Sequence, residues 1–304
     1  MKNAGGFVAF FSRVLLTLLI LAIFSFMNDE KQMGKKTGAV PINTFYAPKL
    51  PQQLSFAGEP VPITREDVKE KFDKEFLKIY FDPGNMIYLI KLSNKNFPVI
   101  EERLRANGVP DDFKYLCIAE SNMQSWAASK AGAVGYWQFM PSTASGYGLD
   151  HNSLVDERRD LQKATDAACK FFIRAYKKFG NWTAAAASYN CGMGGYNSRV
   201  TAQHSTNYYD LDLPEETNKY MHRILSFKYI LENAGSLGYI VPDSLKYTVP
   251  ETKIMEVTSA AGNLNQVAEE NGISYKELQW YNPWIKGYTL PANKLYHLML
   301  PVKK

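Results

Sequence analysis

The sequence predicts a mainly α protein in which a helical domain is followed by a small βααβ module. Several segments before residue 240 place apolar residues at the spacing of one helix face. After Gly235 the pattern changes, and two short helical segments stand between two strand-like runs. Hydrophobic residues make up 46% and charged residues 21% of the 304 residues, an ordinary globular composition that excludes a wholly disordered chain.

Residues 1–27 are expected to be a signal peptide or a membrane anchor. Lys2 and Arg13 precede the apolar run VLLTLLILAIFSFM, which is short for a membrane span and suits a signal peptide. No small-x-small cleavage site is evident, so an uncleaved anchor remains open, and a buried core helix is the remaining alternative. No Cys follows the run, so we expect no lipoprotein attachment. The expected location is the periplasm or cell envelope, with membrane contact only through this segment.

Residues 28–63 are expected to form a tether, because prolines interrupt any helix there. The domain is expected at 64–240, with its core at 110–232. Its first helix should start with a capping Thr64. A second helix is expected in the stretch 93–110 and should end at Gly108. These helices are expected to support the segment that follows.

The helix predicted next carries an acid on its apolar face. Asp111 or Asp112 is expected to cap its start. The residues that share one face are Phe113, Leu116, Cys117 and Glu120. Burial raises the pKa of a carboxyl group, which is what a general acid needs near neutral pH. Glu120 is therefore a candidate catalytic acid; the alternative is a rim residue turned to solvent.

The stretch after Glu120 is rich in Gly and aromatic residues, with Gln138 among them, although Gln138 alone could be a surface amide. A helix with a continuous apolar face is expected over 156–180, with Gly180 as its stop. Asn181 should cap the next helix, which ends in CGMGGYN and so puts Tyr189 and Asn190 at a helix-to-loop junction.

A capping Asn would explain Asn190 without a function. The helix expected over 214–235 carries Glu215 and Glu216 in its first turn, where they suit the helix dipole.

The cysteines and the charge exclude several classes of function. Cys117, Cys169 and Cys191 have no CxxC spacing, which argues against a zinc site. Cys117 and Cys169 are expected as small core residues, while one disulfide stays possible. The net charge of +5 is scattered without a basic stripe, so no nucleic-acid partner is expected. A mild positive balance suits an anionic polymer such as a cell-wall glycan, and it suits many other partners equally well.

Residues 241–250 are expected to be a linker and 251–304 a separate module. Its strands are IMEVT and KLYHLMLP, and its helices are NLNQVAEENG and SYKELQWYN, the second with a Ser cap. The order is therefore β-α-α-β.

Six motifs occur in one order between Phe113 and Leu231: AES, S-x-AGA-x-GYWQFMPSTA, DERRD, FGNW, ASYNCG and LPEETNKY. This stretch resembles the lysozyme-like catalytic domain of lytic transglycosylases, closest to the membrane-bound type D branch of the soluble-transglycosylase superfamily. The terminal module resembles a LysM domain, although SAAGN replaces the usual turn after the first strand. LysM domains bind N-acetylglucosamine in cell-wall glycans.

The resemblance implies a role for each matching residue. Glu120 matches the sole catalytic acid/base. The substrate-binding positions are Ser129, Gln138, Met140, Tyr189, Asn190 and Glu216. Two positions differ from the family pattern: Asn218 stands where relatives often have Arg, and Tyr136 where many have Leu.

The resemblance implies non-hydrolytic cleavage of the MurNAc-β-1,4-GlcNAc bond in peptidoglycan, with 1,6-anhydromuramoyl products and no cofactor or metal. A single acid suits this reaction, whereas most glycosidases need two carboxylates. The alternatives are hydrolysis, as in goose-type lysozyme, and a non-catalytic peptidoglycan-binding protein. The oligomeric state is left open.

Overall fold

The computed structural model describes residues 47–258, 262–292 and 294–302. The expected signal peptide or anchor, and the expected tether as far as residue 46, lie outside these residues. The elements given below belong to one compact unit, Leu50–Lys304. Within the described residues, no helix combines the length and apolar character needed to cross a bilayer.

The chain folds into a mainly α domain followed by a βααβ module, which confirms the predicted fold class. The first part contains β1 (Ser55–Phe56), β2 (Glu59–Pro60), α2 (Glu66–Tyr80), α3 (Pro83–Ala106), α4 (Phe113–Ser121), α5 (Pro141–Gly146), η1 (Glu157–Arg159), α6 (Leu161–Phe179), α7 (Trp182–Gln203), η2 (Tyr208–Asp210), α8 (Glu215–Glu232) and η3 (Asp243–Leu245). The module contains β3 (Thr252–Val257), α9 (Leu264–Glu270), α10 (Tyr275–Tyr281) and β4 (Tyr296–Pro301). β3 and β4 pair antiparallel, from Thr252↔Pro301 to Val257↔Tyr296.

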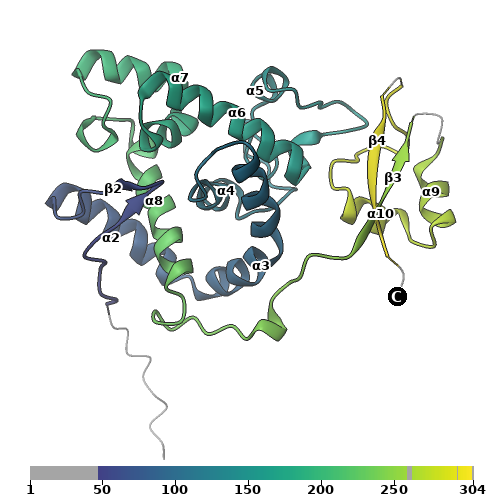
Figure 1. Ribbon diagram of the computed structural model, residues 1–304, viewed down its shortest axis with the longest axis horizontal. Coiled ribbons are helices and arrows are strands. Elements are labelled where there is room, and N and C mark those ends of the chain that lie inside the picture. The colour runs from purple at the N-terminus through teal and green to yellow at the C-terminus, as the bar shows by residue number, and fades with distance from the viewer. Residues whose placement is uncertain (1–46, 259–261, 293, 303–304) are drawn as a thin grey trace, which may run out of the picture. The chain divides into compact units, whose positions relative to one another are not determined.

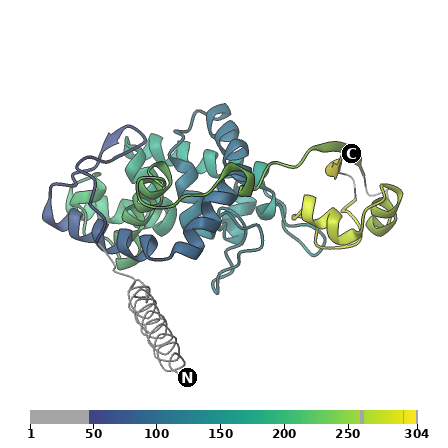
Figure 2. The ribbon, with the colours of Figure 1, turned by 90° about the horizontal axis from the view of Figure 1, so that it is seen from below.

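The short helix α4 lies at the centre of the helical part (Figure 1) and packs against α3 and α8. Its expected apolar face is confirmed, since Phe113, Leu116 and Cys117 have no exposed surface. α2 runs alongside α8. Figure 2 shows α8 nearly end-on. The carboxyl end of α4, where Glu120 stands, is thereby held among long helices.

Two helices begin at other residues than expected. α3 starts at Pro83, where Asp82 accepts a hydrogen bond from the backbone N–H of Asn85, and it continues through Pro98. α6 starts at Leu161 rather than Asp156, because Asp160 caps it by accepting from the Lys163 N–H at 2.9 Å. The preceding residues form η1, and their side chains hold a loop of the site described below.

Two expected caps are wrong. The residue before α2 is Arg65, not Thr64, and it makes no side-chain cap. Asp112 precedes α4, but its carboxylate leaves the helix uncapped. It accepts instead from the Ala57 N–H at 2.7 Å and the Lys228 Nζ at 2.6 Å. Tertiary partners have therefore replaced the local cap.

Residues 50–63, the end of the expected tether, pack onto the helical domain. The β1–β2 hairpin buries Phe56, whose ring centroid lies 5.1 Å from that of Phe113. Glu59 accepts from the backbone N–H groups of Trp182 at 2.6 Å and Thr183 at 2.9 Å. A carboxylate there satisfies free N–H groups at the positive end of α7.

Replacing Glu59 by Gln is expected to lower the free energy of unfolding by about 1–2 kcal/mol, because the charged capping acceptor is lost. Urea unfolding followed by circular dichroism measures this change. Glu70→Gln, an exposed position on α2, serves as the control. An equal effect in both variants would contradict the capping role.

The cysteines agree with the sequence. Cys117 and Cys169 are buried, and Cys191 is partly buried. All three are free thiols, so no disulfide joins them. The prediction that Cys117 and Cys169 are small core residues is confirmed.

Candidate active site

Glu120 lies in the last turn of α4, where the chain turns sharply. Asn122 and Met123, which follow the helix, have φ angles of 52° and 57°, in the left-handed region that L-residues rarely adopt. Glu120 is partly buried, and Tyr220 of α8 donates a hydrogen bond to its Oε1. Such strain beside a half-buried acid is typical of a functional site.

Burial raises the pKa of Glu120 to about 7, from an ordinary value of 4.5. The hydrogen bond from Tyr220 and the positive charge of Arg223 act in the opposite direction, while the negative charge of Glu216 adds to the rise. Removal of water from the carboxyl group is thus the dominant cause. Near neutral pH a large fraction of Glu120 is protonated and able to donate a proton.

Three residues of α8 face this acid from successive turns. Glu216, Tyr220 and Arg223 lie at i, i+4 and i+7, on one side of the helix. Arg223 Nη1 pairs with Glu216 Oε1 at 3.2 Å. Glu216 was predicted from the sequence as a site residue, whereas Tyr220 and Arg223 were not. The same helical spacing, applied forward from Glu216, would have found both.

The GYWQ loop, residues 129–140, is fastened beside Glu120 by hydrogen bonds from separate helices. Ser121, the residue after the acid, donates to the Tyr136 carbonyl at 2.7 Å. Tyr189 of α7 donates to the Trp137 carbonyl, also at 2.7 Å. The Trp137 indole is fully buried and donates to Thr165 Oγ1 at 2.9 Å. The loop is thereby held to α4, α6 and α7.

The DERRD motif, residues 156–160, also holds the GYWQ loop through hydrogen bonds. The Arg158 guanidinium donates to the carbonyls of Gly132 at 3.3 Å and Phe139 at 3.2 Å. Asp156 holds that guanidinium through two hydrogen bonds of 2.8 Å, and both side chains are buried. Gly135 lies so close to the Arg158 carbonyl that a Cβ there would come within 1.9 Å of the oxygen.

Gln138 has a φ of 49° and is the third left-handed residue of the site, after Asn122 and Met123. Its side-chain Nε2 donates to the carbonyls of Ala127 at 3.1 Å and Gly135 at 2.9 Å. The carboxamide nitrogen is thus bonded to the loop and to the segment just before it, which leaves the carboxamide oxygen as the end that can contact a ligand.

Tyr189 and Asn190 lie just before a kink in α7. Gly192 there has φ 76° and ψ 148°, and the helix then resumes to Gln203. The expected Gly-rich loop is therefore a kink. Asn190 Oδ1 accepts from Thr217 Oγ1 at 2.7 Å, which joins α7 to α8. Burial and the nearby charge of Glu120 raise the pKa of Tyr189 well above its usual value.

Ser129 and Met140, at the two ends of the GYWQ loop, make no hydrogen bond to Glu120. The exposed Ser129 hydroxyl accepts from the Ala133 N–H at 3.0 Å within its own turn. Met140 precedes α5 and leaves 40% of its surface exposed. The structure therefore brings Tyr189 and Glu216 near the Glu120 carboxyl group. Asn190 is bonded to Thr217, the residue after Glu216, while Ser129, Gln138 and Met140 lie in the GYWQ loop.

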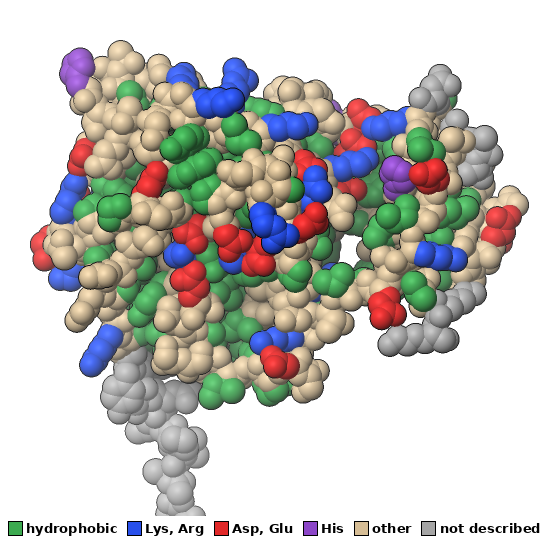
Figure 3. All heavy atoms as spheres, in the orientation of Figure 1, with side chains coloured by type: hydrophobic (Ala, Val, Ile, Leu, Met, Phe, Trp, Pro, Cys, Tyr) green, Lys and Arg blue, Asp and Glu red, His purple; other side chains and the backbone are tan. Residues whose placement is uncertain are grey.

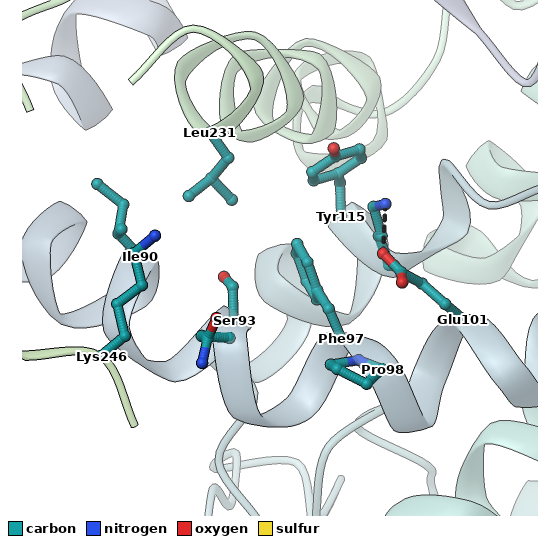
Figure 4. Close-up of a pocket in the computed structure, with 10 residues that line it drawn as sticks. Ile90, Ser93, Phe97, Pro98, Glu101, Tyr115, Leu231 and Lys246 are labelled. Carbon is teal, nitrogen blue, oxygen red and sulfur yellow. Dashed lines mark hydrogen bonds and ion pairs between the residues drawn. The ribbon is translucent and has the colours of Figure 1, made fainter. Parts of the chain in front are cut away.

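A cavity of about 390 Å³ opens on another face of α4 (Figure 4). Phe97, Tyr115 and Leu231 line its apolar side. The Lys114 and Glu101 side chains at its edge pair with each other at 2.7 Å. Because it contains none of the predicted site residues, the chemistry is not placed there.

Charges are mixed on the surface seen in Figure 3, where Lys and Arg side chains are interspersed with Asp and Glu and form no continuous basic stripe. Within the part of the chain that the structure describes, no group of three or more His, Cys, Asp and Glu side chains is arranged to hold a metal ion.

Comparison with known families gives two matches. Residues 97–211 match the transglycosylase SLT domain, and residues 253–304 match the soluble lytic transglycosylase C-terminal LysM-like domain. The first match contains Glu120, the GYWQ loop and the Tyr189–Asn190 pair. The chain therefore contains a transglycosylase SLT domain followed by a LysM-like domain of the soluble lytic transglycosylase C-terminal type.

The chain is homologous to membrane-bound lytic murein transglycosylase D of Escherichia coli (strain K12), with 32% identity over 211 residues, 67% of this chain and 46% of the relative. It thus spans about half the length of that relative. A putative tributyltin chloride resistance protein of Alteromonas sp. (strain M-1) is 29% identical over 96 residues, 31% of this chain and 46% of its own length.

Two solved structures show weaker similarity. The 70 kDa soluble lytic transglycosylase of Escherichia coli is 13% identical with a TM-score of 0.41, over 61% of this chain and 34% of its own. An inactive mutant of lytic transglycosylase Slt from Pseudomonas aeruginosa is 20% identical with a TM-score of 0.38. The match covers 50% of this chain and 26% of that protein.

Proposed function

We propose that this protein is a peptidoglycan lytic transglycosylase in which Glu120 is the sole general acid/base. The observation that carries the proposal is the Glu120 carboxyl group, whose pKa burial raises to about 7 although the residue is only partly buried. The homology to lytic murein transglycosylase D supports the substrate, peptidoglycan, and a location in the cell envelope.

In the first step, protonated Glu120 donates its proton to the glycosidic oxygen between MurNAc and GlcNAc. The bond from that oxygen to C1 of MurNAc breaks, and positive charge develops at C1. The Tyr189 hydroxyl donates its own hydrogen to the Trp137 carbonyl, which leaves its oxygen lone pairs to face that charge. The 2-acetamido group of the sugar assists in the same way.

In the second step, ionised Glu120 removes the proton from the C6 hydroxyl of the same MurNAc. The C6 oxygen attacks C1 and closes a 1,6-anhydro ring, so the proton returns to Glu120 and no water is consumed. Glu216 is the other acid of the site, but it is exposed and paired with Arg223. We therefore assign Glu216, with Gln138 and Asn190, to substrate binding, and Ser129 and Met140 to the groove ends.

Digestion of purified peptidoglycan in water labelled with heavy oxygen tests the reaction. Mass spectrometry of the released muropeptides should show anhydromuramoyl ends without the label. Labelled reducing ends would instead show hydrolysis, as in goose-type lysozyme, and contradict the water-free step. Binding to the wall without any cleavage would support the non-catalytic alternative.

Replacing Tyr220 by Phe is expected to raise the pKa of Glu120 further, because the donated hydrogen bond stabilises the ionised form. In the wild type, kcat/KM should fall as pH rises through about 7, where Glu120 loses its proton. In Tyr220→Phe this fall should move to higher pH. The value of kcat/KM on the plateau below the fall should drop by about tenfold, because the carboxyl group loses its fixed orientation.

Tyr229→Phe, on the same helix, is the control and should leave both features unchanged. The measurement is the pH profile of kcat/KM on a soluble glycan fragment. A fall that stays in place, or moves to lower pH, would show that Tyr220 does not act on Glu120.

A further inference from the structure

The LysM-like module is packed against residues 150–157, the segment between α5 and η1. Val155 forms a β-bridge with Ile285, and Leu154 accepts from the backbone N–H groups of Lys286 and Gly287 at 2.8 and 3.0 Å. Gly287 lies so near Leu154 that a Cβ there would come within 2.6 Å of its Cδ2. The two segments are thus in close backbone contact.

The contact has an apolar centre. Val155 has no exposed surface and belongs to the module's own core cluster, with Leu264, Trp284 and Leu298 among its members. A side chain from the helical domain therefore completes the core of a module of about fifty residues. Domains of that size bury little apolar surface alone.

Two lysines of the module hold the same segment. Lys294 Nζ lies 3.0 Å from Oε1 of the buried Glu157 and 2.5 Å from Asp150 Oδ2. Lys286 Nζ donates to the Asn152 carbonyl at 2.6 Å. A separate contact, between Lys95 of α3 and the Trp280 ring of α10 at 4.5 Å, joins the module to the domain elsewhere.

Asp156 links this contact to the active site. Its backbone N–H donates to the Trp284 carbonyl of the module at 2.8 Å. Its carboxylate holds the Arg158 guanidinium, which in turn holds the Gly132 and Phe139 carbonyls of the GYWQ loop. Asp156 is therefore bonded to the module through its backbone and, through its side chain, to the Arg158 guanidinium that holds the loop.

We infer that the docked module is a positioning element of the active site: its contact with residues 150–157 sets the Asp156–Arg158 pair that holds the GYWQ loop. This role is separate from the glycan binding that the resemblance to LysM domains implies for the module. A module joined only by its linker would leave residues 150–157 as an exposed loop, free to move with the Arg158 anchor. The effect on turnover rests on the proposed function, whereas the effect on loop order does not.

Two substitutions in the full chain weaken the contact to different degrees. Lys294→Ala removes the ion pairs with Glu157 and Asp150, and Val155→Asp puts a charge into the module's core. Lys294→Arg should restore the ion pairs, and Lys276→Ala, at an exposed position of α10, is the matched control.

Hydrogen exchange of the backbone amides and kinetics on a glycan fragment too short to reach the module are the readouts. We expect residues 132–139 to lose protection in Lys294→Ala, more so in Val155→Asp, while α7 and α8 keep theirs. KM should rise and kcat/KM should fall, by about tenfold in Val155→Asp, since small displacements of positioning groups weaken catalysis strongly. The pH at which Glu120 loses its proton should not move.

Unchanged exchange over 132–139, despite faster exchange over 150–157, would overturn the inference. Loss of protection spread equally over α6, α7 and α8 would also overturn it, because the contact would then only add global stability. A wild-type chain without glycan cleavage would reject the proposed function and leave the exchange result to stand alone.

Discussion

Replacing Glu120 by Gln is expected to lower kcat on peptidoglycan by about 10²–10⁴-fold, since a general acid/base contributes that much. Gln has nearly the same shape and can still accept the hydrogen bond from Tyr220, so the fold and wall binding should persist. Release of anhydromuropeptides and sedimentation with insoluble peptidoglycan measure the two properties. Full activity in this variant would reject Glu120 as the catalytic group.

The same substitution should stabilise the protein at alkaline pH. The pKa of Glu120 in the folded chain, about 7, lies above its ordinary value of 4.5. The favourable contribution of the protonated group is therefore complete below pH 4.5 and is lost as pH rises through 7. Above pH 7 the Gln variant should unfold with a free energy larger by about 3 kcal/mol.

At pH 4 the two proteins should be equally stable, because Glu120 is then protonated in both the folded and the unfolded chain. Denaturant unfolding at the two pH values measures the difference, with the exposed Glu269→Gln as the control. An equal difference at both pH values would show that burial of the charge is not the cause.

Replacing Gly135 by Ala is expected to disrupt the GYWQ loop. Its φ of +84° is unfavourable for any side chain, and the new Cβ would fall 1.9 Å from the Arg158 carbonyl oxygen, which backbone movement alone can relieve. We expect a loss of about 3 kcal/mol of unfolding free energy and about 100-fold of activity.

Gly132→Ala separates backbone strain from the collision. Gly132 has a φ of +91°, yet nothing lies within 4 Å of a Cβ there. The free energy of unfolding of that variant should fall by about 1 kcal/mol, the usual cost of a side chain at positive φ. Equal losses in the two variants would contradict the close contact with Arg158. Thermal unfolding and glycan cleavage measure both effects.

The elements predicted well from the sequence are those set by local chemistry. Gly180 ends α6 in the left-handed conformation. Asn181 caps α7, because its Oδ1 accepts a hydrogen bond from the Ala184 N–H at 2.7 Å. Ser274 forms the capping box of α10. The apolar faces of α4 and α6 follow from helical spacing alone. Such features involve residues a few positions apart and therefore leave a clear pattern in the chain.

The features that the sequence did not predict depend on distant partners. Asp112 gives up a capping role for Lys228, which lies 116 positions later. The hydrogen bond from Tyr220 to Glu120 spans 100 positions, and helical spacing from Glu216 points to Tyr220 without identifying its partner. The docking of Val155 into the module's core likewise joins segments whose local sequences give no sign of each other. Domain boundaries and the roles of the site residues remain predictions.

The contact between Tyr220 and Glu120 makes the acid a product of complete folding. α4 alone, before α8 packs on it, would carry a hydrated Glu120 with an ordinary pKa near 4.5, ionised at neutral pH and unable to protonate a glycosidic oxygen. On the proposed function, a chain cut before α8 would therefore be inert toward peptidoglycan. On the proposed function, the packing of α8 against α4 is thus what turns Glu120 into a general acid.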